Sequence, residues 1–287
     1  YKKEAEKHSD VIVQDFFSVE AYKSTKFKNI NPKIITAVAM FYDLEFPDIF
    51  LKDIYKILDD DGLFVLQLSY TPLMLNQLAF DNILFEHFYY YSLFNLKNLL
   101  EKNKFKIVDT QLNDINGGSF RVYIMKDCGN IKTFGTQPYR DVCNFRINSL
   151  LEYEKTLKLD SIETWKDFFN KINDLKNQTM SFINSKADAI QYGLMAKYEI
   201  WNFSAIFWLS SDIIDGVAER SPYKFGLKMV GTNIPIYSEY EMRIAKPDYL
   251  ILGPWHFLSE FMEREKDFLI KGGKFIVTCP KFEIIGL

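Results

Sequence analysis

A glutamate and a histidine stand side by side in an aromatic stretch in the first third of the chain. The stretch FDNILFEHFYYYSL runs from Phe80 to Leu93 and contains Glu86 and His87, followed by three consecutive tyrosines. An imidazole titrates near neutral pH, and an adjacent carboxylate can orient it or raise its basicity, so the pair predicts general acid or base chemistry. Composition alone favours a structural role, because aromatic-rich segments commonly form cores or subunit interfaces.

A second candidate feature is a glycine pair followed by an arginine. The sequence reads Asn116, Gly117, Gly118, Ser119, and Arg121 comes two residues later. Adjacent glycines let a backbone approach a ligand and turn its N–H groups toward an anion, and an arginine can hold a phosphate or a carboxylate. A plain hairpin turn is the commoner use of such a pair.

The first third of the chain predicts a parallel sheet that would position these residues. We expect buried strands over Val11–Val13 and Ile34–Val38, a helix over Pro47–Leu58, a turn over Asp59–Gly62 and a strand over Leu63–Leu68. Parallel strands joined by a helix bind ligands beyond their carboxyl ends. Those ends are residues 39–44 and 67–72, and the Glu-His stretch follows the second of them closely.

The rest of the chain predicts a helical connection and then a second α/β region. We divide the chain into residues 1–139, 140–186 and 187–287, with the middle part helical. The individual elements expected after residue 93 are helices over Phe94–Lys102, Tyr198–Trp208, Glu239–Ala245 and Phe257–Ile270, and strands over Phe105–Val108, Phe120–Met125, near Ile190, near Ile213–Ala218, over Tyr249–Leu252 and over Lys274–Thr278. Gly272 and Gly273 stand where the last of these helices must end.

Composition excludes several functional classes. The chain has 287 residues and a net charge of -3, and it has no basic tract, which argues against a nucleic-acid partner. Its apolar runs are far shorter than the roughly 20 residues of a membrane-spanning helix. The three cysteines are widely separated, so neither a metal site nor a disulfide framework is predicted, and a reducing cytoplasm is the simplest setting. No GxGxxG motif follows a predicted strand, which disfavours a nicotinamide dehydrogenase.

Three blocks of residues resemble one known family. The chain is similar to the two-domain S-adenosylmethionine-dependent C-methyltransferases that act on nucleotide-linked deoxysugars and related saccharide precursors. The similarity extends over nearly the whole chain. The blocks are residues 39–44 with Phe50 and the 58–62 turn; residues 80–93 with 116–121; and Tyr192, Gly193, Lys197, 224–236, 246–249, 254–256 and 272–274.

The resemblance implies a fold, a reaction and a set of roles. The expected fold is a partial class I methyltransferase sheet of Rossmann-like type, then the helical connection and a second Rossmann-like domain. His87 matches the family's base, which forms an enolate beside a sugar ketone, and Glu86 would orient it. The remaining expected contacts are Met40, Phe41 and Tyr42 with S-adenosylmethionine, and Tyr90, Tyr91, Gly117, Gly118, Ser119, Arg121 and Lys197 with the sugar nucleotide.

Several departures from the family pattern keep a second hypothesis open. Phe85 replaces a histidine, Leu84 precedes it, and Tyr198 replaces a glycine in the carboxyl-terminal region. The family's glycine-rich cofactor loop and cysteine cluster do not occur, so we expect the chain to be an amino-terminally truncated member. The alternative function is a degenerate, non-catalytic sugar-nucleotide-binding or scaffold protein. The sequence leaves open whether the protein is a monomer or a homodimer.

Overall fold

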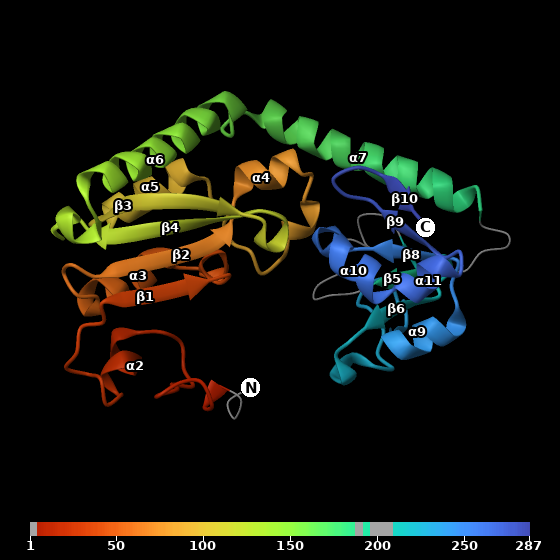
Figure 1. Cartoon of the computed structure of the whole chain (residues 1–287), viewed down its shortest axis with the longest axis horizontal. Helices are drawn as coiled ribbons and strands as arrows, with labels where there is room; N and C mark the ends of the chain where they lie inside the picture. The colour runs from red at the N-terminus through yellow and green to blue at the C-terminus, as the bar shows by residue number, and fades with distance from the viewer. Residues whose placement is uncertain (1–4, 187–191, 196–208) are drawn as a thin grey trace. The chain divides into compact units, whose positions relative to one another are not determined.

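The computed structural model describes residues 5–186, 192–195 and 209–287, and it divides into two compact units (Figure 1). The first unit comprises residues 1–71 and 86–157, and the second comprises residues 72–85 and 158–287. Each unit is built around its own sheet. The protein is thus a mixed α/β protein in which parallel strands occur in both units.

The sheet of the first unit has four strands in the order β1-β2-β4-β3. β1 (Ile34–Val38) lies parallel to β2 (Leu63–Ser69), as the sequence predicts. β4 (Ser119–Lys126) is antiparallel to both β2 and β3 (Phe105–Asn113). The last pair forms a hairpin, which brings the 116–119 turn to the same edge of the sheet as the carboxyl end of β2.

The parallel pair is joined by helix α3 (Pro47–Ile57), whose sequence explains its position. Pro47 occupies the first turn, where its missing N–H costs no hydrogen bond. Leu51, Ile54 and Ile57 recur at helical spacing, and all three are buried. At roughly 1.5–3 kcal/mol for each fully buried large aliphatic side chain, this face fastens α3 to the unit's core.

The prediction of a buried strand over Val11–Val13 is wrong. These residues are irregular and at least partly exposed, and the next regular element after them is the short helix α2 (Val19–Lys23), which Ser18 caps. A three-residue β-branched run forms a strand only beside a partner, and this run has no pairing in the described residues. β1 is also less buried than predicted, because it is the outer strand and both Ile34 and Val38 are more than half exposed.

Two long helices follow the first sheet. α6 (Gln137–Leu157) packs against β3, where Arg146 forms a bidentate pair with the fully buried Asp109, with N–O distances of 2.8 and 2.6 Å. α7 (Ile162–Asn184) belongs to the second unit, and Phe182 near its end packs on Tyr249. No described helix, these two included, is long and apolar enough to cross a membrane.

The remaining elements of the first unit and of the 72–85 segment are short. α5 (Leu93–Lys102) begins at the capping residue Ser92 and packs beside β3. The others are α4 (Thr71–Asn76) and the 3-10 turns η1 (Phe41–Asp43), η2 (Phe80–Asn82), η3 (Ile115–Gly117) and η4 (Ile131–Phe134).

The sheet of the second unit has six strands in the order β10-β9-β8-β5-β6-β7. β5 to β9 are parallel to one another and β10 is antiparallel. If the six strands are numbered along the chain and read from the β7 edge of the sheet, their order is 3-2-1-4-5-6. Dinucleotide-binding sheets have this order. The bounds are β5 (Tyr192–Met195), β6 (Gly216–Glu219), β7 (Ile236–Ser238), β8 (Tyr249–Leu252), β9 (Lys274–Val277) and β10 (Glu283–Ile285).

Sequence patterns located most of the described elements of this unit. The helix over 239–245 and the strand over 249–252 are confirmed as α9 (Glu239–Ala245) and β8. The helix expected over 257–270 is divided at Glu265 into α10 (Leu258–Arg264) and α11 (Lys266–Ile270), after η6 (Trp255–Phe257), and η5 (Pro222–Lys224) was not predicted. The strand expected near residue 190 is found as β5, which begins at Tyr192, whereas the helix expected over 198–208 lies outside the described residues.

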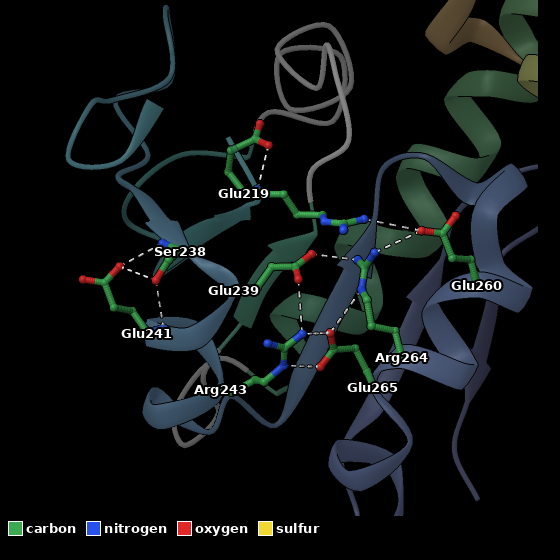
Figure 2. A network of polar contacts seen from close by, with 9 residues as sticks. Glu219, Ser238, Glu239, Glu241, Arg243, Glu260, Arg264 and Glu265 are labelled. Carbon is green, nitrogen blue, oxygen red and sulfur yellow. Dashed lines mark hydrogen bonds and ion pairs between the residues drawn. The ribbon is translucent and has the colours of Figure 1, made fainter. Parts of the chain in front are cut away.

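A network of ion pairs connects α9 to α10 and to Glu265, the residue that follows α10 (Figure 2). Arg243 binds both oxygens of Glu265, which is 3% exposed, at 2.8 and 2.5 Å. Arg264 contacts Glu239 at 2.8 Å and Glu260 at 3.1 Å. Buried carboxylates are tolerated only when paired in this way, so the network fixes the two helices side by side.

A segment from the first third of the chain is part of the second unit. Residues 72–85, here called the strap, are held at the carboxyl ends of β8 and β9. Trp255 donates to Asp81 at 3.4 Å, His256 lies 3.9 Å from the same carboxylate, and the Cys279 thiol donates to two strap carbonyls, at 3.2 and 2.9 Å. Burial raises the pKa of Asp81 to about 6. The aromatic stretch 80–93 is therefore divided between the units: residues 80–85 belong to the second unit and residues 86–93 to the first.

Candidate functional site

The carboxyl end of β1 turns sharply into η1. Ala39 has a φ of 53°, a left-handed conformation that is uncommon for any residue except glycine, and its N–H donates to the Gln67 carbonyl on β2 at 2.9 Å. The turn buries Phe41 and Tyr42 and leaves Met40 partly exposed. Of the three residues predicted to flank a cofactor, Met40 therefore has the most accessible side chain.

The Glu-His segment lies directly on this turn. The Tyr42 carbonyl accepts hydrogen bonds from the N–H groups of Phe88, at 2.9 Å, and Tyr89, at 3.3 Å. The His87 ring lies 4.2 Å from the Tyr42 ring, measured between centroids. His87 is thus held at the carboxyl end of a parallel strand, the edge at which α/β sheets bind ligands.

His87 has a carboxylate neighbour that sequence reasoning missed. Its Nε2 lies 3.8 Å from Oδ1 of Asp43, and only 10% of the His87 side chain is exposed. Burial, and then the nearby charge of Glu86, raises the pKa of Asp43 to about 6. Asp43 lies in the 39–44 block that carried the family resemblance, so its place after β1 was the available signal.

The glycine pair forms a tight hairpin between β3 and β4. Gly117 and Gly118 have φ values of 76° and 123°, which a residue with a Cβ rarely adopts. The Gly118 carbonyl accepts from the Tyr70 N–H at 3.3 Å, and the Ser119 hydroxyl donates back to Ile115 at 2.8 Å. The glycine pair thus forms a hairpin turn, one of the two uses expected from the sequence. Its role in ligand binding stays a prediction.

Arg121 is oriented by a buried amide. Oε1 of Gln67, a residue 7% exposed, accepts from Nε and Nη2 of Arg121 at 2.9 and 2.6 Å. An amide has no net charge, and no ion pair to Arg121 occurs in the described residues, so the guanidinium charge is not neutralised there. Gln67 was not predicted. It lies near the end of β2, opposite Arg121 in the sheet register.

The tyrosines differ in their surroundings. Tyr90 stands edge-on to His87, with 6.3 Å between ring centroids. Tyr91 is 5% exposed and packs on Phe41, and burial raises the pKa of its hydroxyl, which has no hydrogen-bond partner in the part of the chain that the structure describes. Lys197, the remaining predicted contact, lies outside the described residues.

A buried glutamate binds both ends of the segment that connects β2 to α5. Glu154 accepts from the Tyr70 hydroxyl at 2.7 Å and from the N–H groups of Leu93 and Phe94 at 2.6 and 2.9 Å. The Thr71 N–H donates to the Tyr91 carbonyl at 3.0 Å beside it. The carboxylate thus caps α5 and holds both ends of the segment that contains His87.

The second unit contains a cavity of about 380 Å³ that involves none of the predicted site residues. Residues of α9 and α11 line it, together with Ala218 of β6 and Leu250 of β8. Asp248 and Gly273, which immediately precede β8 and β9, also line it. The cavity therefore lies toward the amino ends of these strands, the edge at which parallel sheets do not usually bind ligands.

Comparison with known proteins gives matches of three kinds: to a family model, to a curated protein and to solved structures. A family model described as "C-methyltransferase C-terminal domain" matches residues 114–280. C-methyltransferase NovU of Streptomyces niveus is 28% identical over 245 residues, which is 83% of this chain and 56% of NovU, so the chain spans about half the length of that relative. The SAH-bound crystal structure of magnesium protoporphyrin IX methyltransferase (ChlM) from Synechocystis PCC 6803 is 12% identical, with a TM-score of 0.28 over 34% of this chain and 46% of ChlM. That score is too low to support an argument.

Proposed function

This chain belongs to the C-methyltransferase family, and on that premise we propose that it takes part in S-adenosylmethionine-dependent methylation of a carbon in a nucleotide-linked keto sugar. The observation that carries the proposal is the position of His87, a nearly buried imidazole beside a carboxylate at the carboxyl end of a parallel strand. General bases in enzymes are commonly held in this way.

The proposed role of His87 is proton removal from the carbon next to the sugar ketone. Loss of that proton gives an enolate, whose carbon is the nucleophile and whose oxygen carries negative charge. The imidazolium that forms lies beside the carboxylate of Asp43, whose negative charge favours the protonated ring. S-adenosylmethionine, when bound, supplies the electrophilic methyl group. Beyond proton transfer, the protein has only to align the two carbon atoms and to stabilise the enolate oxygen.

The proposed ligand contacts surround the same edge of the sheet. Arg121 would hold a phosphate of the sugar nucleotide, because Gln67 orients its guanidinium without neutralising it. The 117–119 turn and Tyr90 would border the sugar. Met40 and the backbone of η1 would border the methyl donor, since Phe41 and Tyr42 direct their side chains into the core.

The proposal is tested by methyl transfer from isotope-labelled S-adenosylmethionine to a panel of nucleotide-linked keto sugars. We expect one labelled methyl group on a carbon adjacent to the ketone, identified by mass spectrometry and NMR of the product. Binding of the sugar nucleotides without any transfer across the panel would overturn the proposal and would support the non-catalytic sugar-nucleotide-binding alternative.

Replacing Arg121 by glutamine should weaken binding of the sugar nucleotide while sparing the chemical step. A charge-assisted hydrogen bond contributes about 1.5–3 kcal/mol, so KM for the sugar nucleotide should rise by about tenfold or more. Steady-state kinetics with the best substrate of the panel measures the effect. The control variant Arg140→Gln removes the same charge near the start of α6 and should change neither KM nor kcat. An unchanged KM in Arg121→Gln would exclude Arg121 from the binding site.

A further inference from the structure

His87 is enclosed by groups from two elements of the first unit. Tyr42 and Asp43 come from η1, and Glu86 and Tyr90 come from the segment of His87 itself. The rings of the two tyrosines contact the imidazole through their faces and edges, at centroid distances of 4.2 and 6.3 Å. Among the described residues, the carboxylates near the imidazole are those of Asp43 and Glu86.

The two carboxylates are not equivalent. Asp43 approaches Nε2 of His87 to 3.8 Å. Both carboxylates are exposed, so exposure does not separate them, but Glu86 acts on Asp43: burial and then the charge of Glu86 raise the pKa of Asp43. Like charges in proximity repel, so Glu86 makes Asp43 more dependent on a cationic neighbour. Protonated His87 is the cation that the structure places beside Asp43.

We propose that Asp43, and not Glu86, is the positioning residue for His87, holding the imidazole by its Nε2 side and stabilising the imidazolium when the ring takes up a proton. The catalytic consequence rests on the function proposed above, whereas the pairing itself does not. A distance of 3.8 Å is longer than a hydrogen bond, so this contact is an ion pair when the His87 ring is protonated. Catalytic contacts of this kind often shorten when a substrate binds.

The pairing is tested by NMR titration of the histidine ring resonances, which requires no activity. The chain has only three histidines, so the His87 signals are identified by their loss in His87→Gln. Because an anion near an imidazole favours its protonated form, Asp43→Asn should lower the His87 titration midpoint by about half a unit or more. Glu86→Gln is the matched carboxylate-to-amide change and should lower it by less. An equal or larger effect of Glu86→Gln would overturn the proposal.

The catalytic consequence is tested separately by kinetics. In Asp43→Asn, kcat should fall by about tenfold or more with little change in either KM, because the positioning of the base and not substrate binding is impaired. Asp43→Glu should restore part of kcat. Glu45→Gln removes an exposed carboxylate from the same loop and should leave kcat unchanged. A shifted midpoint with an unchanged kcat would reject the positioning role, whereas an inactive parent protein with a shifted midpoint would reject the proposed function and retain the pairing.

Discussion

Replacement of His87 by glutamine should lower kcat for methyl transfer by about 10²–10⁴-fold, the usual contribution of a general base. Glutamine preserves much of the volume of the side chain, which is 10% exposed and packed on Tyr42, so the first unit should remain folded. Rates of methyl transfer, together with circular dichroism and thermal unfolding, measure the two effects. KM for the methyl donor should change little, because the role proposed for His87 is proton removal from the sugar and not binding of the donor.

His8→Gln is the matched control for this change. His8 is exposed in the amino-terminal part of the described chain, and its replacement should leave the rate unchanged. If His87→Gln unfolds the first unit, the aromatic segment is structural, as its composition suggests. If the variant remains folded and fully active, His87 is not the base.

Glu154→Gln should produce the largest loss of stability among the single changes considered, about 2 to 4 kcal/mol for the first unit. Three donors, the Tyr70 hydroxyl and the Leu93 N–H in buried hydrogen bonds and the Phe94 N–H in a part-buried one, would share one carbonyl oxygen, and the new amide would direct its own N–H groups toward them. Each buried donor left without an acceptor costs about 1–3 kcal/mol. Chemical denaturation and hydrogen exchange at Leu93 and Phe94 measure the loss.

Glu152→Gln provides the comparison for that experiment. Glu152 lies on the same helix, is 71% exposed and pairs with Lys155, so its loss should change stability by well under 1 kcal/mol. Equal effects of the two replacements would contradict the role assigned to Glu154. Because α5 begins at its hydrogen bonds, Glu154→Gln should also reduce methyl transfer by loosening the segment that contains His87.

Local patterns predicted the elements whose buried side chains follow a regular order in the sequence. α3 was located by its apolar spacing and Pro47, and β8 by a four-residue apolar run. Such periodicity reflects which side chains face the core, and it is visible in a single sequence. The Val11–Val13 prediction was wrong for the complementary reason, since a strand also requires a neighbour and the sequence does not specify one.

The candidate site was predicted only in part for a related reason. His87 and Arg121 were identified because their residue types suggest chemistry. Asp43, Gln67 and Glu154 were missed because their importance comes from neighbours 44, 54 and at least 60 positions away in the chain. Contacts over such separations leave no periodic trace, and no rule of composition distinguishes these three from exposed polar residues.

The strap has a consequence for the way the protein can be dissected. Since residues 72–85 belong with residues 158–287, the two units are interleaved along the gene, and no single cut separates them. A fragment that starts at residue 158 would lose the partners of Cys279 and Trp255. A chimaera that replaces the second unit by that of a relative therefore has to replace residues 72–85 together with residues 158–287.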